Sequence, residues 1–77
     1  MKQFSITMHS FADIQAFVSL SAQQPFEVIV GDLDQNISGK SLLAMLSLNI
    51  CRPMLVSVNC DDADFLRFQS AAARFIA

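Results

Sequence analysis

Hydrophobic and polar residues alternate in two stretches of the chain, residues 4–8 and 54–60, as is typical of strands with one buried face. One face of the second stretch carries Met54, Val56, Val58 and Cys60. A run rich in β-branched residues at 26–30 predicts another strand. The glycine and aspartate that follow it predict a hairpin turn into a short partner strand at 33–37.

Apolar residues at helical spacing follow the first strand. Phe11, Ile14, Phe17 and Val18 form this stripe. Ser10, followed three residues later by Asp13, resembles a capping box, so we expect the first helix to run from about Ser10 to Ala22.

Two further helices are predicted downstream. The segment from Ser41 to Leu48 is densely apolar, and Ser41 is a suitable N-cap because its hydroxyl can accept a backbone N–H one turn later. Asp61 or Asp62 can cap the last helix, near whose end Arg74 suits the helix dipole. The buried stripe of that helix consists of Phe65, Phe68, Ala72, Phe75 and Ile76.

The predicted order is strand, helix, strand, strand, helix, strand, helix, which favours a two-layer α+β sandwich. The chain has 77 residues, which suit a single domain at 1–77, and its seven phenylalanines can supply a compact core.

Charge and hydropathy narrow the function classes. The net charge is −2 and the five lysines and arginines are scattered, so we expect no nucleic-acid partner. No apolar run approaches the roughly 20 residues that span a bilayer, so we expect no membrane partner and a cytoplasmic location. Cys51 and Cys60 could form a disulfide, although free thiols are expected without a secretion signal, and they lack the second pair of a zinc site.

One segment combines a polar turn with the apolar second helix, and it carries a family resemblance. Asn36 to Leu43 reads Asn-Ile-Ser-Gly-Lys-Ser-Leu-Leu, and Arg52-Pro53 and the last strand follow. This arrangement resembles the second half of HPr, the histidine-containing phosphocarrier protein of the sugar phosphotransferase system. The resemblance implies an open-faced sandwich with a four-stranded antiparallel sheet under three helices.

Ser41 has two compatible interpretations. As a serine at a helix start it can be a plain N-cap, whereas the resemblance implies the regulatory serine that HPr kinase phosphorylates. The run Gly39-Lys40-Ser41 also ends a phosphate-loop motif, but Asp34 stands where that motif needs a glycine.

The leucines after Ser41 are also open to two interpretations. Apolar residues on nearly every side of a short helix predict either full burial or an exposed patch that binds a partner. The resemblance implies that Leu42, Leu43 and Leu46 form a docking surface for HPr kinase, phosphotransferase components or a regulator.

His9 is the only histidine and the one weak catalytic candidate. In HPr a Gly-Leu-His-x-Arg-Pro motif carries the phosphoryl group. Counting back from Phe17-Val18, the family's histidine position falls on Ser10, the arginine position on Ala12 and the proline position on Asp13. Asp13 would set a negative charge beside a phosphoryl group.

The sequence therefore predicts a divergent, non-enzymatic HPr-like domain that binds proteins, with a regulatory site at Ser41, no metal and no cofactor. An active phosphocarrier using His9 is one alternative. A small structural domain, dimerising through the open sheet face or the apolar helix, is another.

Overall fold

A computed structural model of the protein describes residues 1–31, 35–48 and 52–76. Its elements are β1 (Lys2–Ile6), α1 (Phe11–Ala22), β2 (Val28–Gly31), β3 (Asn36–Ser38), α2 (Leu42–Leu46), β4 (Met54–Val58), α3 (Asp62–Ala71) and the 3-10 turn η1 (Ala73–Phe75). Apart from the added turn η1, this is the element order that the hydrophobic pattern predicts.

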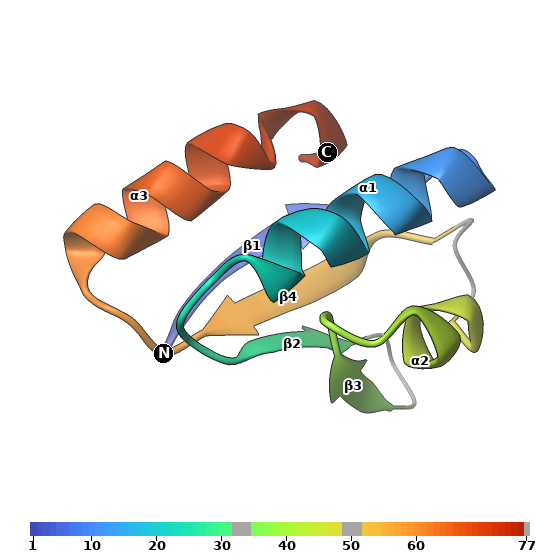
Figure 1. The fold of residues 1–77 in the computed structure, drawn as a ribbon, viewed down its shortest axis with the longest axis horizontal. Coiled ribbons are helices and arrows are strands. Elements are labelled where there is room, and N and C mark those ends of the chain that lie inside the picture. The colour runs from blue at the N-terminus through green and yellow to red at the C-terminus, as the bar shows by residue number, and fades with distance from the viewer. Residues whose placement is uncertain (32–34, 49–51, 77) are drawn as a thin grey trace.

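The four strands form one sheet in the order β1-β4-β2-β3, and every neighbouring pair is antiparallel. The three helices lie in a second layer, and α1 and α3 run roughly along the direction of β4 in Figure 1. The fold is thus the expected open-faced α+β sandwich with a four-stranded antiparallel sheet and three helices.

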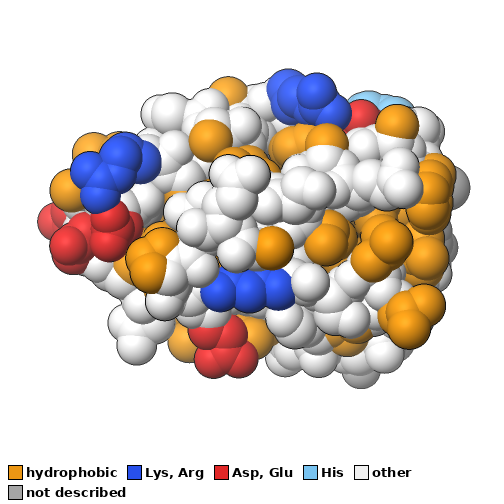
Figure 2. Space-filling view, in the orientation of Figure 1, with side chains coloured by type: hydrophobic (Ala, Val, Ile, Leu, Met, Phe, Trp, Pro, Cys, Tyr) orange, Lys and Arg blue, Asp and Glu red, His pale blue; other side chains and the backbone are white. Residues whose placement is uncertain are grey.

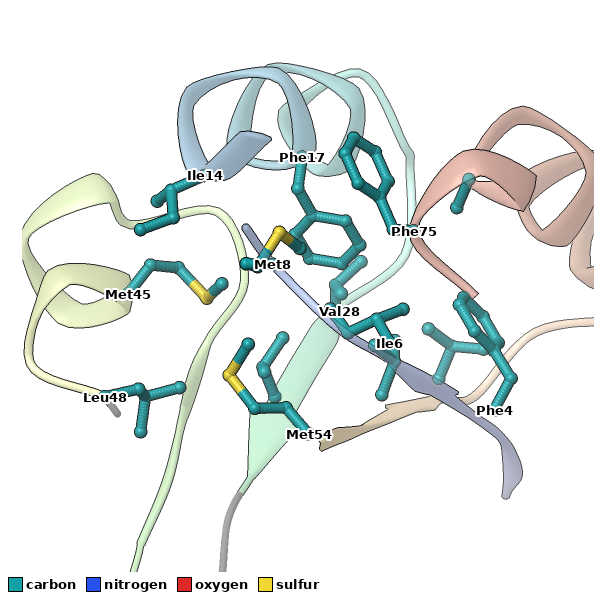
Figure 3. Packing of buried hydrophobic residues seen from close by; sticks show 14 of the residues in the cluster. Phe4, Ile6, Met8, Ile14, Phe17, Val28, Met45, Leu48, Met54 and Phe75 are labelled. Atoms are coloured by element: carbon teal, nitrogen blue, oxygen red, sulfur yellow. The ribbon is translucent and has the colours of Figure 1, made fainter. Parts of the chain in front are cut away.

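The core lies between the two layers. Successive strand residues point to opposite faces, so alternate residues of β1, β2 and β4 meet the helices, as Figure 3 shows for Ile6, Val28 and Met54. Phe17 of α1 and Phe68 of α3 are both fully buried, and Phe17 packs edge to face on Phe75 with ring centroids 5.8 Å apart. Aromatic contacts therefore join the first helix to the end of the chain.

The ends of several elements differ from the predictions. The partner strand in the hairpin is described at Asn36–Ser38 instead of 33–37, and residues 32–34 lie outside the described part of the chain. The middle helix is shorter than predicted, because Ser47 already caps it, with its hydroxyl donating to the Ala44 carbonyl at 2.6 Å. The strand predicted at 54–60 ends at Val58.

The end of the chain also differs from the predicted single helix. The helix stops at Ala71 and a 3-10 turn follows, so Arg74 lies outside the last helical turn. Its guanidinium instead lies 4.6 Å above the Phe75 ring and 3.6 Å from the Asp13 carboxylate. The position of Arg74 is therefore explained by tertiary contacts and not by the dipole of α3.

Candidate functional site

The start of α2 is built on Ser41. Its backbone is extended, and its Oγ accepts the N–H of Ala44 at 3.3 Å, which satisfies one of the backbone donors that a helix start leaves unpaired. The N-cap interpretation is confirmed. Ser41 is half-buried, so part of its side chain still meets solvent.

Gly39 brings this turn close to the sheet. Its N–H donates to the carbonyl of Val28 at 2.7 Å. A side-chain carbon at this position would lie 2.8 Å from Val28 Cγ1 and 3.1 Å from Val30 Cγ2, which is closer than packed atoms tolerate. The glycine of the Gly-Lys-Ser run is thus needed for close packing on β2.

Lys40 is also committed to the fold. Its Nζ donates to the carbonyl of Gln24 at 2.9 Å, and its backbone N–H donates to Ser38 Oγ at 3.2 Å. The amine therefore ties the start of α2 to the end of α1. Since Gly39 and Lys40 both have structural partners, the Gly-Lys-Ser run is accounted for without a nucleotide.

The leucines of α2 divide between the core and the surface. Met45 is fully buried and Leu42 is half-buried against the core, so these two residues hold the helix on the domain. Leu43 is 82% exposed and Leu46 is 43% exposed. Of the three leucines predicted to bind a partner, two lie open to solvent and Leu42 is mainly a packing residue.

Phe11 is a further exposed apolar residue that was predicted to be buried. Its spacing placed it on the buried stripe of α1, but it is the first residue of the helix and is 50% exposed. Helices α1 and α2 pack against each other, and Figure 2 shows hydrophobic side chains gathered over α2 and the start of α1. We call Phe11, Leu43 and Leu46 the apolar surface.

The carboxylate of Asp13 takes part in capping the start of α1. Ser10 is the N-cap, and its Oγ accepts the N–H of Asp13 at 3.2 Å. Asp13 Oδ2 in turn accepts the backbone N–H of His9 at 3.0 Å. The predicted capping-box-like start is confirmed, with His9 exposed just ahead of it.

This geometry weakens the phosphocarrier alternative. The Asp13 carboxylate lies at the helix end where an anion would otherwise be favoured, so a phosphoryl group on His9 would meet a negative charge. Arg74 is a cation near this helix start, but its guanidinium is paired with the Asp13 carboxylate. The expected conflict at Asp13 is therefore visible in the contacts around His9.

The acidic cluster before α3 has structural roles. Asp61 caps the helix by accepting the N–H of Asp64 at 2.8 Å, Asp64 pairs with Arg67, and Lys2 Nζ lies 3.1 Å from Asp62. Within the described ranges, no group of three histidine, cysteine, aspartate or glutamate side chains could hold a metal ion.

Cys60 is a free thiol, while Cys51 lies outside the described residues. Desolvation raises the pKa of Cys60, and the negative charge of Asp64 raises it further. Because the thiolate is the reactive form, the Cys60 thiol is a weak nucleophile at neutral pH. Cys60 therefore supplies no reactive thiol to the start of α1 or of α2.

No helix in the described part of the chain has the length and apolar character needed to cross a bilayer. The chain was also compared with models of known protein families and with curated proteins, and neither comparison finds a match.

Proposed function

We propose that this protein is a divergent, non-enzymatic relative of HPr that binds another protein through its apolar surface. The observation that carries the proposal is the contrast within α2: Leu43 is exposed, although Met45 on the same helix is fully buried. An exposed leucine pair beside an exposed phenylalanine costs solubility and adds nothing to the core, which is the usual character of a binding surface.

The proposal extends to regulation at Ser41. A phosphate there would add about two negative charges directly before Leu42 and Leu43. The partner's apolar residues would then have to approach a doubly charged group, so we expect phosphorylation to weaken docking. Ser41 is only half-buried as a residue, which supports access by a kinase. The partners that this proposal favours are HPr kinase, phosphotransferase components or a regulator, in the cytoplasm.

The docking surface can be tested with charge substitutions. Leu43→Glu and Leu46→Glu should each reduce binding to HPr kinase, or to another partner found by affinity capture, by roughly tenfold or more, since residues central to an interface contribute about 1–2 kcal/mol or more. The measurement is isothermal titration calorimetry. Leu66→Glu is the matched control, because Leu66 is a leucine on α3 whose exposure of 60% lies between those of Leu43 and Leu46. Equal effects of all three substitutions would contradict the proposal.

The regulatory site requires a separate experiment. The protein is incubated with ATP and HPr kinase, and the label is mapped by mass spectrometry. We expect a phosphate on Ser41 that is lost in Ser41→Ala and kept in Ser47→Ala, which removes the other serine flanking the same helix. If a true HPr is phosphorylated under the same conditions and Ser41 is not, regulation at Ser41 is excluded. That result would not affect the docking proposal, which the calorimetry tests separately.

Dimerisation is the second candidate, because the same apolar surface could pair with its copy on another chain. Sedimentation should then give twice the monomer mass, and Leu43→Glu should restore the monomer. A monomeric wild-type protein at high concentration would exclude this candidate.

A further inference from the structure

The face of the sheet opposite the helices carries an open hollow of about 790 Å³. This volume falls within the range of about 300–1,000 Å³ that is usual for small-molecule sites. The lining is mostly apolar and comes from all four strands together with Met1 and the Arg52-Pro53 segment. No residue of the apolar surface on α1 and α2 takes part in it, so the hollow is a separate site.

One row of paired residues crosses the hollow. In the strand register Ser5 lies opposite Leu55, Leu55 opposite Gly31, and Gly31 opposite Asn36, which makes one row across the sheet. Gly31 has no side chain, and the Asn36 amide oxygen lies where its side-chain carbon would be. The Asn36 amide therefore covers the glycine and leaves Leu55 as the apolar residue of the row.

The floor of the hollow is apolar although it faces solvent. Leu55, on a central strand, is 41% exposed, and Ile29 on the neighbouring strand also lines the hollow. The Gln3 amide is held on Ser57 Oγ at 3.1 Å along the same face. An apolar ligand body of a few carbons would cover Leu55 and Ile29.

One arginine lines the hollow. Arg52 is exposed and carries the only charged side chain among the described residues of the lining. Within the ranges that the structure describes, no carboxylate forms an ion pair with it. A guanidinium presents paired N–H donors that match a carboxylate, and Ser5 and Asn36, at opposite ends of the row, also line the hollow.

We infer that this hollow binds a small organic carboxylate with a short branched apolar body. The carboxylate lies on Arg52 and the body lies on Leu55 and Ile29. The size of the hollow and the charge of Arg52 favour a small anion over a macromolecule. This inference does not depend on docking at α2, because the two sites share no residue.

The test is a titration of isotopically labelled protein, followed by amide chemical shifts, with 4-methylpentanoate as the probe and neutral 4-methylpentanamide as its matched control. We expect saturable shifts at Ser5, Ile29 and Leu55 with the carboxylate, and at least fivefold weaker binding of the amide. Absence of saturable shifts at millimolar probe, shifts centred on α2, or equal binding of the two probes would overturn the inference. Shifts on the open face that follow protein concentration instead of probe would indicate a second copy and would also overturn it.

Two variants locate the ligand. Arg52→Gln should weaken binding of the carboxylate by roughly tenfold and leave the amide unaffected, since a charged hydrogen bond is lost only for the former. Leu55→Ala should weaken both probes, because it removes apolar surface from the floor of the hollow. Arg67→Gln, on the exposed side of α3, is the control that removes an arginine elsewhere and should bind normally. Normal carboxylate binding by a folded Arg52→Gln protein would exclude the proposed orientation.

Discussion

The starts of α1 and α2 use the same cap and carry different charges. In both, a serine in extended conformation accepts the N–H of the residue three positions later. At α1 the first turn contains Asp13, whose carboxylate is bound to the chain itself. At α2 the first turn contains no acid, Lys40 precedes it, and exposed leucines follow. One helix start is therefore already neutralised by the protein, whereas the other can accept a modifying charge.

The comparison teaches that a helix N-terminus is not by itself an anion site. Its partial positive charge is available only where the chain has not already placed a carboxylate there. At α1 the cap is Ser10, the residue that the resemblance aligns with the HPr histidine, and Asp13 lies in the first turn. A phosphate is therefore expected to be better accommodated at Ser41 than on His9.

The largest expected effect is on the anchoring of α2. Met45→Ala removes a fully buried side chain, so we expect the free energy of unfolding to fall by about 2–4 kcal/mol. Leu43→Ala on the same helix should change it by less than about 0.5 kcal/mol, because Leu43 is exposed. Urea denaturation followed by circular dichroism measures both. Similar losses for the two variants would show that Leu43 is not the exposed residue described here.

Gly39→Ala should have the next largest effect. The added methyl group would press on the buried side chains of Val28 and Val30, which we expect to cost about 1–3 kcal/mol of unfolding free energy. The measurement is again urea denaturation. Gly31→Ala is a useful control, because the atom it meets belongs to the Asn36 side chain, which can move aside. A harmless Gly39→Ala would contradict the close approach of this turn to β2.

Removing either serine cap should have a smaller effect of about 1 kcal/mol. Ser10→Ala and Ser41→Ala each leave one helical N–H without its side-chain partner. Thermal denaturation would detect both losses. Ser41→Asp keeps an acceptor at the cap and should retain most of the stability, whereas a loss as large as that of Ser41→Ala would indicate that a negative charge is not tolerated at this helix start.

The smallest expected effect on the unfolding free energy comes from removing the charge of Asp13 at the start of α1. Asp13→Asn keeps the side chain's shape and removes its charge, so we expect a loss of about 0.3–1 kcal/mol that shrinks as salt is raised. The measurement is the unfolding free energy at low and high sodium chloride. At α2, where the first turn has no acid, Ser41→Asn keeps a neutral N-cap and is the control that should show no such salt dependence. A salt-independent loss at Asp13 would assign it a purely hydrogen-bonding role.

Local patterns predicted much of what the structure contains. The alternation of Met54, Val56 and Val58 correctly predicted a strand with its buried face, and the spacing of Ser10 and Asp13 predicted the capped start of α1. These predictions succeed because strand and helix periods and caps depend on residues within a few positions of one another.

Other features could not be read from the order of residues. The leucines of α2 are apolar on nearly every side, so no period could show that Met45 faces the core and Leu43 faces solvent. Phe11 fitted the buried stripe and is half-exposed, because it starts the helix where the covering layer ends. Arg74 meets Asp13 only because the end of the chain returns to the start of α1.

The sequence by itself determined the class of fold, the order of its elements and the caps of its helices, since these follow from short-range spacing and hydrogen bonding. Only the tertiary structure decided which apolar residues remain exposed, why Gly39 must lack a side chain, and that the open face of the sheet carries a hollow lined by Leu55. Those outcomes depend on contacts between segments far apart in the chain, and such contacts follow from the packing of one layer on another.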